Sequence, residues 1–146
     1  MVRRGLLLLS LSTLTAACSL PAPSFESYRA KAIDAAEQTI SQGQTAILTA
    51  ALLERDRLFA PTAAVQLEDA EEAATAATQD FAAVLPPDDR SQDLRGTVLP
   101  DLQLVSDLIS RMRFALRHRD VEQAVRLRSS LDDPLDRLER WTEPFA

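Results

Sequence analysis

Apolar residues recur at steps of three and four along four successive segments of this chain, a spacing that favours helices over any other regular structure. No stretch alternates apolar and polar residues with a period of two, and no Asn-Gly or Asp-Gly turn signals a hairpin. The core-facing residues expected in the first two segments are Phe25, Ile33, Ala36, Ile40, Ile47, Ala51 and Leu58, then Ala63, Leu67, Ala70, Ala74, Ala77, Phe81 and Val84. Those of the last two are Leu94, Val98, Leu102, Val105, Leu108, Ile109, Met112 and Leu116, then Ala124, Leu127, Leu131, Leu138 and Trp141.

Caps and prolines mark the boundaries of the first two segments. Ser24 is placed to cap a helix that runs to about Phe59, with a bend expected at residues 42–44 around a mid-helix glycine. Pro61 separates this helix from the second, which Pro86 and Pro87 end.

The third and fourth segments show similar signals. The third helix is expected from about Ser91 to Arg117, and Pro100 either kinks it or marks its true start. The fourth begins near Val121 behind an Asp120-to-Gln123 capping box, and it restarts at Pro134 with Asp133 as the cap.

Four amphipathic segments with short connections predict an all-α fold, specifically an up-down antiparallel four-helix bundle. The alternative is a tetratricopeptide-type helical repeat, but the chain shows no self-similarity at a period of about 34 residues. We therefore expect one helical bundle domain over residues 24–146.

The net charge and the few metal-binding residues argue against several classes of function. The chain has a formal net charge of −6, whereas nucleic-acid binding normally needs a basic face, so we expect no nucleic-acid partner. One His and one Cys leave too few ligands for a zinc, haem or iron–sulfur centre, so we expect no metal and no cofactor.

The first residues have the composition of an export signal. Arg3 and Arg4 supply a positive region, residues 6–14 an apolar region too short to cross a bilayer, and Thr15, Ala16 and Ala17 a small-residue stretch before Cys18. This segment resembles a bacterial lipoprotein signal, although such signals usually carry Leu where this chain has Thr15.

The resemblance implies a signal peptide over residues 1–17, a lipid such as palmitate on Cys18, and a short tether over residues 18–23. It also implies a protein anchored to the extracytoplasmic side of a bacterial membrane. Without Arg3 and Arg4, the 16 basic side chains fall to 14 against 22 acidic ones, so the mature chain has a net charge of −8. The alternative is ordinary secretory cleavage after Ala17, with Cys18 left as a free thiol.

Arginines gather around the expected turn between the third and fourth helices. They are Arg111, Arg113, Arg117, Arg119, Arg126 and Arg128, whereas residues 62–89 hold seven acids and no base. In an up-down bundle the two sets lie at the end away from the tether. We interpret the arginines as a surface for docking an acidic protein or a polyanionic envelope polymer, and the acids mainly as a solvated face.

Candidates for catalysis are weak. His118 has no triad partners nearby in the sequence, and the pairs Asp88-Asp89 and Asp132-Asp133 stand at expected helix starts, where capping explains them. We therefore expect no catalytic residues and no enzyme.

The expected function is that of a membrane-tethered cell-envelope lipoprotein, acting as a binding, scaffolding or accessory subunit for an envelope or membrane protein. The alternative is a carrier of a small apolar or lipid ligand inside the alanine-lined bundle. An interior cavity of several hundred Å³ would indicate the carrier, whereas a scaffold should be packed without such a void.

Overall fold

The computed structural model describes residues 22–145, with the side chain of residue 145 left aside, and these residues are almost entirely helical. The helices are α1 (Phe25–Glu54), α2 (Ala60–Ala83), α3 (Asp89–Arg117), α4 (Val121–Leu127) and α5 (Asp132–Thr142). Two 3-10 turns follow α4 and α5, at Arg128–Ser130 and Glu143–Phe145. Residues 22–145 contain no strand, and the predicted all-α class is confirmed.

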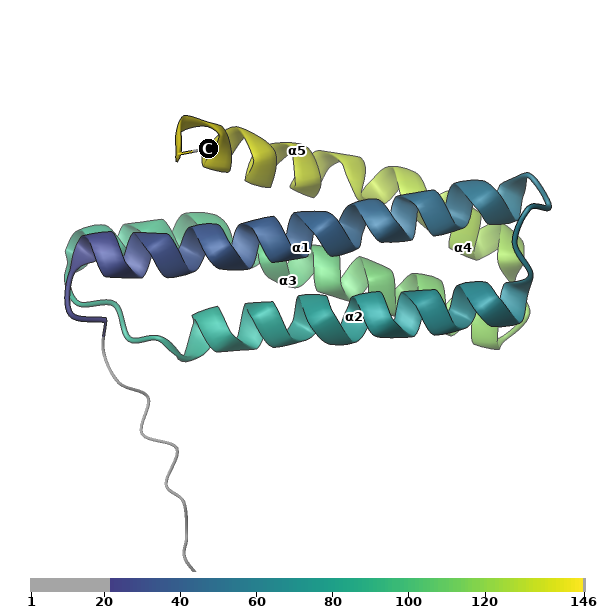
Figure 1. The fold of residues 1–146 in the computed structure, drawn as a ribbon, viewed down its shortest axis with the longest axis horizontal. Helices are drawn as coiled ribbons and strands as arrows, with labels where there is room; N and C mark the ends of the chain where they lie inside the picture. Colours follow the sequence, from purple (N-terminus) through teal and green to yellow (C-terminus); the bar gives the residue numbers. More distant parts are fainter. Residues whose placement is uncertain (1–21, 146) are drawn as a thin grey trace, which may run out of the picture.

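The three long helices lie side by side, with α3 behind α1 and α2 in the view of Figure 1. The chain runs out along α1, back along α2, out again along α3, and returns through α4 and α5 (Figure 1). Helix α1 contacts each of the other four helices. The α1–α2 and α3–α4 connections therefore share the end of the molecule opposite the start of α1 (Figure 1), which we call the tip.

Three of the predicted caps are confirmed. The Ser24 hydroxyl accepts a hydrogen bond from the Ser27 amide at 3.2 Å, and the Asp88 carboxylate accepts one from the Ser91 amide at 2.8 Å. The Asp120 carboxylate accepts one from the Gln123 amide at 2.9 Å. Each cap satisfies an amide in the first helical turn that has no carbonyl partner within the helix, so local sequence determines where α1, α3 and α4 begin.

The prediction that the first helix runs to Phe59 is wrong, because α1 ends at Glu54. Asp56 adopts the left-handed conformation, with φ of 52°. The amides of Asp56 and Arg57 then bond back to the carbonyls of Leu53 and Leu52, at 3.0 and 2.8 Å. This Schellman motif turns the chain out of the helix before Phe59.

The bend expected at residues 42–44 is also absent, since α1 continues through them. Gly43 is buried, and a Cβ atom built on it would lie 2.6 Å from Cδ2 of Leu135. The glycine therefore permits a close approach of α5 to α1. A glycine in a helix interior costs about 1 kcal/mol relative to alanine, which packing here offsets.

The remaining corrections concern prolines. Pro100 lies inside α3 and does not mark its start. The prediction that Asp133 caps the restarted segment is wrong, because α5 begins at Asp132 and has no side-chain cap. Pro134 occupies the first turn of α5, where its missing N–H removes no intrahelical bond. Asp133 also lies in the first turn, where its negative charge interacts favourably with the positive end of the helix dipole.

The buried face of α1 differs from the predicted face more than that of any other helix. Of the seven core residues predicted for the first helix, only Ala36 is buried, and Leu58 lies beyond the end of α1. The buried face consists mainly of small side chains and is made of Tyr28, Ala32, Ala35, Ala36, Thr39, Gly43, Ala46, Thr49, Ala50 and Leu53. Ile40 and Ile47 pack at its edge, partly buried. The helix thus turns its small residues toward its neighbours, which allows close approach.

The other helices follow the predicted faces closely. In α3 the residues from Val98 to Leu116 that were expected inside are buried, and Leu94 is partly buried. In α2 the expected residues from Ala63 to Phe81 are buried, with Val84 partly so. In the last segment Ala124, Leu131 and Leu138 are buried, whereas Leu127 and Trp141 are partly buried.

Candidate functional site

The six predicted docking arginines lie close to the tip, on the second half of α3 and on the segment that follows it. Arg111, Arg113 and Arg117 belong to α3 and Arg119 to the α3–α4 turn. Arg126 lies on α4 and Arg128 in the 3-10 turn after it. The predicted set is therefore brought to one end of the molecule, but its members differ in what they contact.

Two of these arginines tie neighbouring helices together. The Arg113 guanidinium binds the Glu71 carboxylate of α2 through Nε, and again through Nη2 at 3.2 Å. This hydrogen bond holds the pKa of Glu71 below its usual value. Arg128 binds Glu54 at the end of α1, with an N–O distance of 2.7 Å. The acidic run of α2 thus meets the arginine set at Glu71.

Two more arginines pair within their own helices. Arg111 lies 2.7 Å from Asp107, and Arg126 lies 2.6 Å from Glu122, each one helical turn away. Both pairs are largely exposed, so each contributes at most about 1 kcal/mol to stability. Their charges are nevertheless balanced locally, which weakens them as attractors for an acidic partner.

Arg117 and Arg119 differ, because within residues 22–145 neither guanidinium forms an ion pair or hydrogen bond. Arg55 and Arg57 share this property and lie in the other turn of the tip. We call Arg55, Arg57, Arg117 and Arg119 the tip arginines. Sequence reasoning missed the first two, although an Arg-Asp-Arg run directly after a helix was the signal that could have found them.

The two turns have the same backbone geometry. Arg119 adopts the left-handed conformation with φ of 62°, as Asp56 does in the first turn. The amides of Arg119 and Asp120 bond back to the carbonyls of Leu116 and Ala115, each at 2.9 Å. Because both helices end in this motif, both turns project side chains beyond the helix ends.

A shallow hollow of about 460 Å³ lies beside the tip arginines, between the end of α3 and α4. Its lining residues are Ser110, Arg111, Phe114, Ala115, His118, Asp120, Gln123 and Leu127. The Phe114 side chain is 62% exposed, and its ring lies 4.1 Å from the His118 ring, centroid to centroid. We call this the aromatic hollow. Phe59, in the other turn, is 83% exposed.

The aromatic hollow offers contact surface more than acid–base chemistry. Nδ1 of His118 lies 2.9 Å from the Phe114 carbonyl, and the Asp120 carboxylate is engaged as the α4 cap. Asp88, the other candidate acid, also caps a helix, and its hydrogen bonds with Ser91 lower its pKa. Within residues 22–145, no three His, Cys, Asp or Glu side chains gather so that they could hold a metal ion.

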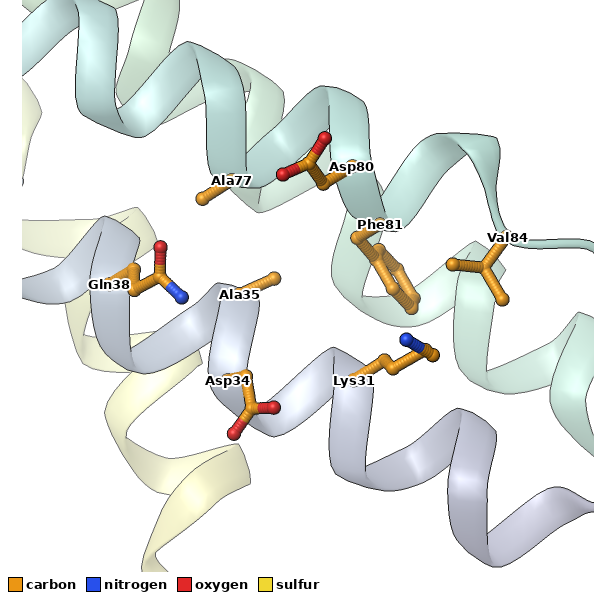
Figure 2. A pocket seen from close by; sticks show the side chains of 8 residues that line it. All are labelled: Lys31, Asp34, Ala35, Gln38, Ala77, Asp80, Phe81 and Val84. Atoms are coloured by element: carbon orange, nitrogen blue, oxygen red, sulfur yellow. The ribbon is translucent and has the colours of Figure 1, made fainter. Parts of the chain in front are cut away.

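A second hollow lies between α1 and α2, near the end opposite the tip (Figure 2). It has a volume of about 160 Å³ and is lined by Lys31, Asp34, Ala35, Gln38, Ala77, Asp80, Phe81 and Val84. Figure 2 shows charged and amide groups from both helices around Phe81. This volume is below the range of about 300–1,000 Å³ typical of pockets for small molecules, so the hollow is a poor fit for a lipid.

The predicted lipidation residue Cys18 lies outside the described residues, as do the signal segment and most of the tether. In the described part of the chain, no helix combines the length and the apolar character that crossing a membrane would require. Comparisons with family models, with curated proteins and with solved structures found no match to this chain.

Proposed function

We propose that this protein is a non-catalytic, membrane-tethered lipoprotein of the bacterial cell envelope that acts as a binding or accessory subunit. In this proposal the chain is cleaved after Ala17, lipid on Cys18 anchors it, and an up-down four-helix bundle follows, with α4 and α5 together as its fourth member. The partner is an acidic face of an envelope or membrane protein.

The observation that carries this proposal is the unpaired state of the four tip arginines. A chain with more acids than bases repels an acidic partner over most of its surface. The tip differs because its two turns gather four basic side chains that no carboxylate within residues 22–145 neutralises, whereas other basic side chains without such a partner, for example Arg140, lie apart from them. Rim charges of this kind chiefly steer association and select the partner.

The position of the tip supports the same function. Helix α1 begins seven residues after Cys18, and its 30 residues span about 45 Å at 1.5 Å per residue. Anchoring at Cys18 would leave the tip accessible and raise its effective concentration near other membrane proteins. The aromatic hollow beside the tip supplies an apolar contact, because Phe114 and Leu127 line it.

The first test is affinity capture of the full chain from detergent-solubilised native membranes, compared with a Cys18→Ala form. Intact-mass measurement would show lipid on the first form and not on the second. We expect one dominant membrane partner whose recovery depends on Cys18. A soluble wild-type protein without lipid would contradict the anchor, and a co-purifying apolar small molecule in place of a protein would favour the carrier.

A second experiment distinguishes docking at the tip from a general effect of positive charge on partner binding. The Arg117→Gln/Arg119→Gln form should recover at least tenfold less partner than the wild type. The matched control is Arg90→Gln/Arg140→Gln, which removes two positive charges at the other end of the molecule. Equal losses in the two double variants would contradict docking at the tip.

A further inference from the structure

The aromatic hollow at the tip is bordered by apolar side chains that reach solvent. Phe114 is 62% exposed, its ring packs against the His118 ring, and Ala115 and Leu127 complete the apolar lining. The volume of about 460 Å³ is large enough to receive a bulky side chain. Covering an exposed phenylalanine removes apolar surface from water, so an apolar occupant of this hollow is favoured.

Most polar side chains that line the hollow already have partners within the chain. The Asp120 carboxylate accepts a hydrogen bond from the Gln123 amide at 2.9 Å, and the Gln123 side chain accepts one from Arg126 at 2.8 Å. Arg111 lies 2.7 Å from Asp107. An occupant therefore gains little by placing a polar group in the hollow and more by placing an apolar group there.

The segment that forms the hollow is basic, in contrast to the whole protein. Residues 110–128 contain six arginines and two acids, a formal charge of +4 in a chain whose net charge is −6. Both acids are engaged, since Asp120 caps α4 and Glu122 lies 2.6 Å from Arg126. This local excess of positive charge attracts carboxylates to the hollow.

Two tip arginines lie next to the hollow along the chain. Arg117 and Arg119 flank His118, which lines the hollow, and all three residues are exposed. Neither guanidinium forms an ion pair within residues 22–145. The edge of the hollow at His118 therefore presents positive charges that a carboxylate of a partner can neutralise.

Two other hollows of the molecule lack this combination. The one along α2 is bordered by Glu68, Glu71 and Glu72, which repel an acidic ligand. The hollow of Figure 2 is bordered by charges of both signs, including Lys31 and Asp34. Among the three, only the aromatic hollow joins an apolar lining to positive charges without partners.

We infer that the docking element of the partner is a short acidic peptide segment that places one bulky apolar side chain in the aromatic hollow, with its carboxylates near Arg117 and Arg119. The inference rests on the proposed function and specifies the chemistry that the tip recognises. A polyanionic polymer would neutralise the arginines but leave Phe114 and Leu127 uncovered. An apolar anchor with charges around it is the usual organisation of a protein interface.

The first test is selection of random phage-displayed peptides on the purified, immobilised full chain in mild detergent. We expect the enriched sequences to combine a Trp, Phe or Leu with flanking Asp or Glu. Enrichment of sequences that lack either feature, or no enrichment, would overturn the inference. Inorganic polyphosphate that binds as tightly as the selected peptide would also overturn it, because charge alone would then be the ligand.

A matched pair of variants tests the hollow itself. Fluorescence anisotropy of the labelled peptide should show at least tenfold weaker binding to Phe114→Ser than to the wild type. Phe59→Ser is the control, because it removes an 83% exposed aromatic ring from the other turn of the tip and should leave the affinity unchanged. Circular dichroism verifies that both variants fold. Equal affinities for the wild type and a folded Phe114→Ser protein would overturn the inference.

Changes in the peptide test the same contacts without altering the protein. Alanine in place of its apolar residue, or amides in place of its carboxylates, should each weaken binding at least tenfold. Retained affinity in either peptide would overturn the inference.

Capture from native membranes separates this inference from the proposed function. Loss of the partner with Arg117→Gln/Arg119→Gln but not with Phe114→Ser would overturn the inference and leave docking at the tip intact. Capture that depends on neither variant would overturn both.

Discussion

Helices α1 and α3 are almost equally long, at 30 and 29 residues, but they contribute to the core in opposite ways. The buried face of α1 is mostly Ala, Thr and Gly. The buried face of α3 is mostly Val, Leu, Ile and Met. The two helices therefore carry different constraints, since the small side chains of α1 allow its neighbours to approach closely and α3 buries large aliphatic side chains.

The difference between the two buried faces determines how substitutions in each helix affect stability. Burying a large aliphatic side chain contributes about 1.5–3 kcal/mol, so the α3 face is sensitive to truncation. An alanine or glycine contributes little by its own burial, but enlarging it forces atoms into occupied space. The comparison therefore predicts that α3 loses stability when residues are made smaller and α1 when they are made larger.

The largest effect is expected at Ile109, which is fully buried in α3. Ile109→Ala should lower the free energy of unfolding by about 2–5 kcal/mol, through lost burial and the cavity that remains. Urea denaturation followed by circular dichroism measures this loss. Leu104→Ala, on the exposed side of the same helix, is the control and should cost under about 1 kcal/mol. Similar losses at both positions would contradict the greater sensitivity of the buried face of α3.

The two helical glycines should respond with opposite signs. Gly43→Ala in α1 should destabilise by about 1–2 kcal/mol, because the new methyl group meets Leu135, itself buried. Gly96→Ala in α3 meets nothing within 4 Å and should stabilise by about 1 kcal/mol through helix propensity. Thermal and urea unfolding compare the two.

A double variant tests whether contact with Leu135 is the reason that Gly43→Ala destabilises the protein. In a Leu135→Ala background the obstructing side chain is gone, so Gly43→Ala should become neutral or stabilising. If Gly43→Ala costs the same in both backgrounds, close approach of α5 is not what requires the glycine.

A smaller, pH-dependent effect is expected where α3 is tied to α2. Glu71→Gln should cost about 1 kcal/mol at pH 7, because a half-buried ion pair with Arg113 is lost. The pKa of Glu71 is lowered in the folded protein from the ordinary 4.5, so folding favours the carboxylate. This contribution is complete above about pH 4.5 and declines as the pH falls through the lower, folded pKa.

Unfolding measured from pH 7 down to pH 3 checks this dependence. The gap between the wild type and Glu71→Gln should narrow below pH 4.5. Glu72→Gln, on the exposed neighbouring position, should differ little from the wild type at pH 7. A gap that widens in acid would have the wrong sign for this pair.

The smallest effect concerns a hydroxyl in the α1 face. Thr39 is buried, and its Oγ1 has no hydrogen-bond partner among residues 22–145. Thr39→Val keeps the shape and removes the unpaired group, so it should stabilise by up to about 1 kcal/mol. Thr78→Val should do the reverse, because that hydroxyl donates to the Ala74 carbonyl at 2.8 Å. Differential scanning calorimetry would show a melting temperature that rises in the first variant and falls in the second.

Several parts of the fold were readable from the sequence because their causes are local. The helical class follows from apolar spacing, and the starts of α1, α3 and α4 follow from Ser24, Asp88 and Asp120, each of which caps an amide three residues away. The inward face of α3 was predictable as well, because its large aliphatic residues have no competing row.

Only two of the four tip arginines were predicted from the sequence. Sequence clustering identified Arg117 and Arg119, but it could not separate them from Arg113 and Arg128, whose carboxylate partners lie on other helices. Arg55 and Arg57 were missed because the first helix was extended to Phe59. The left-handed Asp56 that ends the helix earlier is not signalled by a glycine.

Sequence alone was enough to predict that this chain is helical, where α1, α3 and α4 begin, and that arginines gather near the α3–α4 turn, because propensity, capping and charge are properties of neighbouring residues. Three other features depend on contacts between distant residues: the face of α1 that is buried, the need for a glycine at residue 43, and the set of arginines without a partner. In each of these the deciding atom, such as a Leu135 methyl group or a Glu71 oxygen, comes from a distant part of the chain.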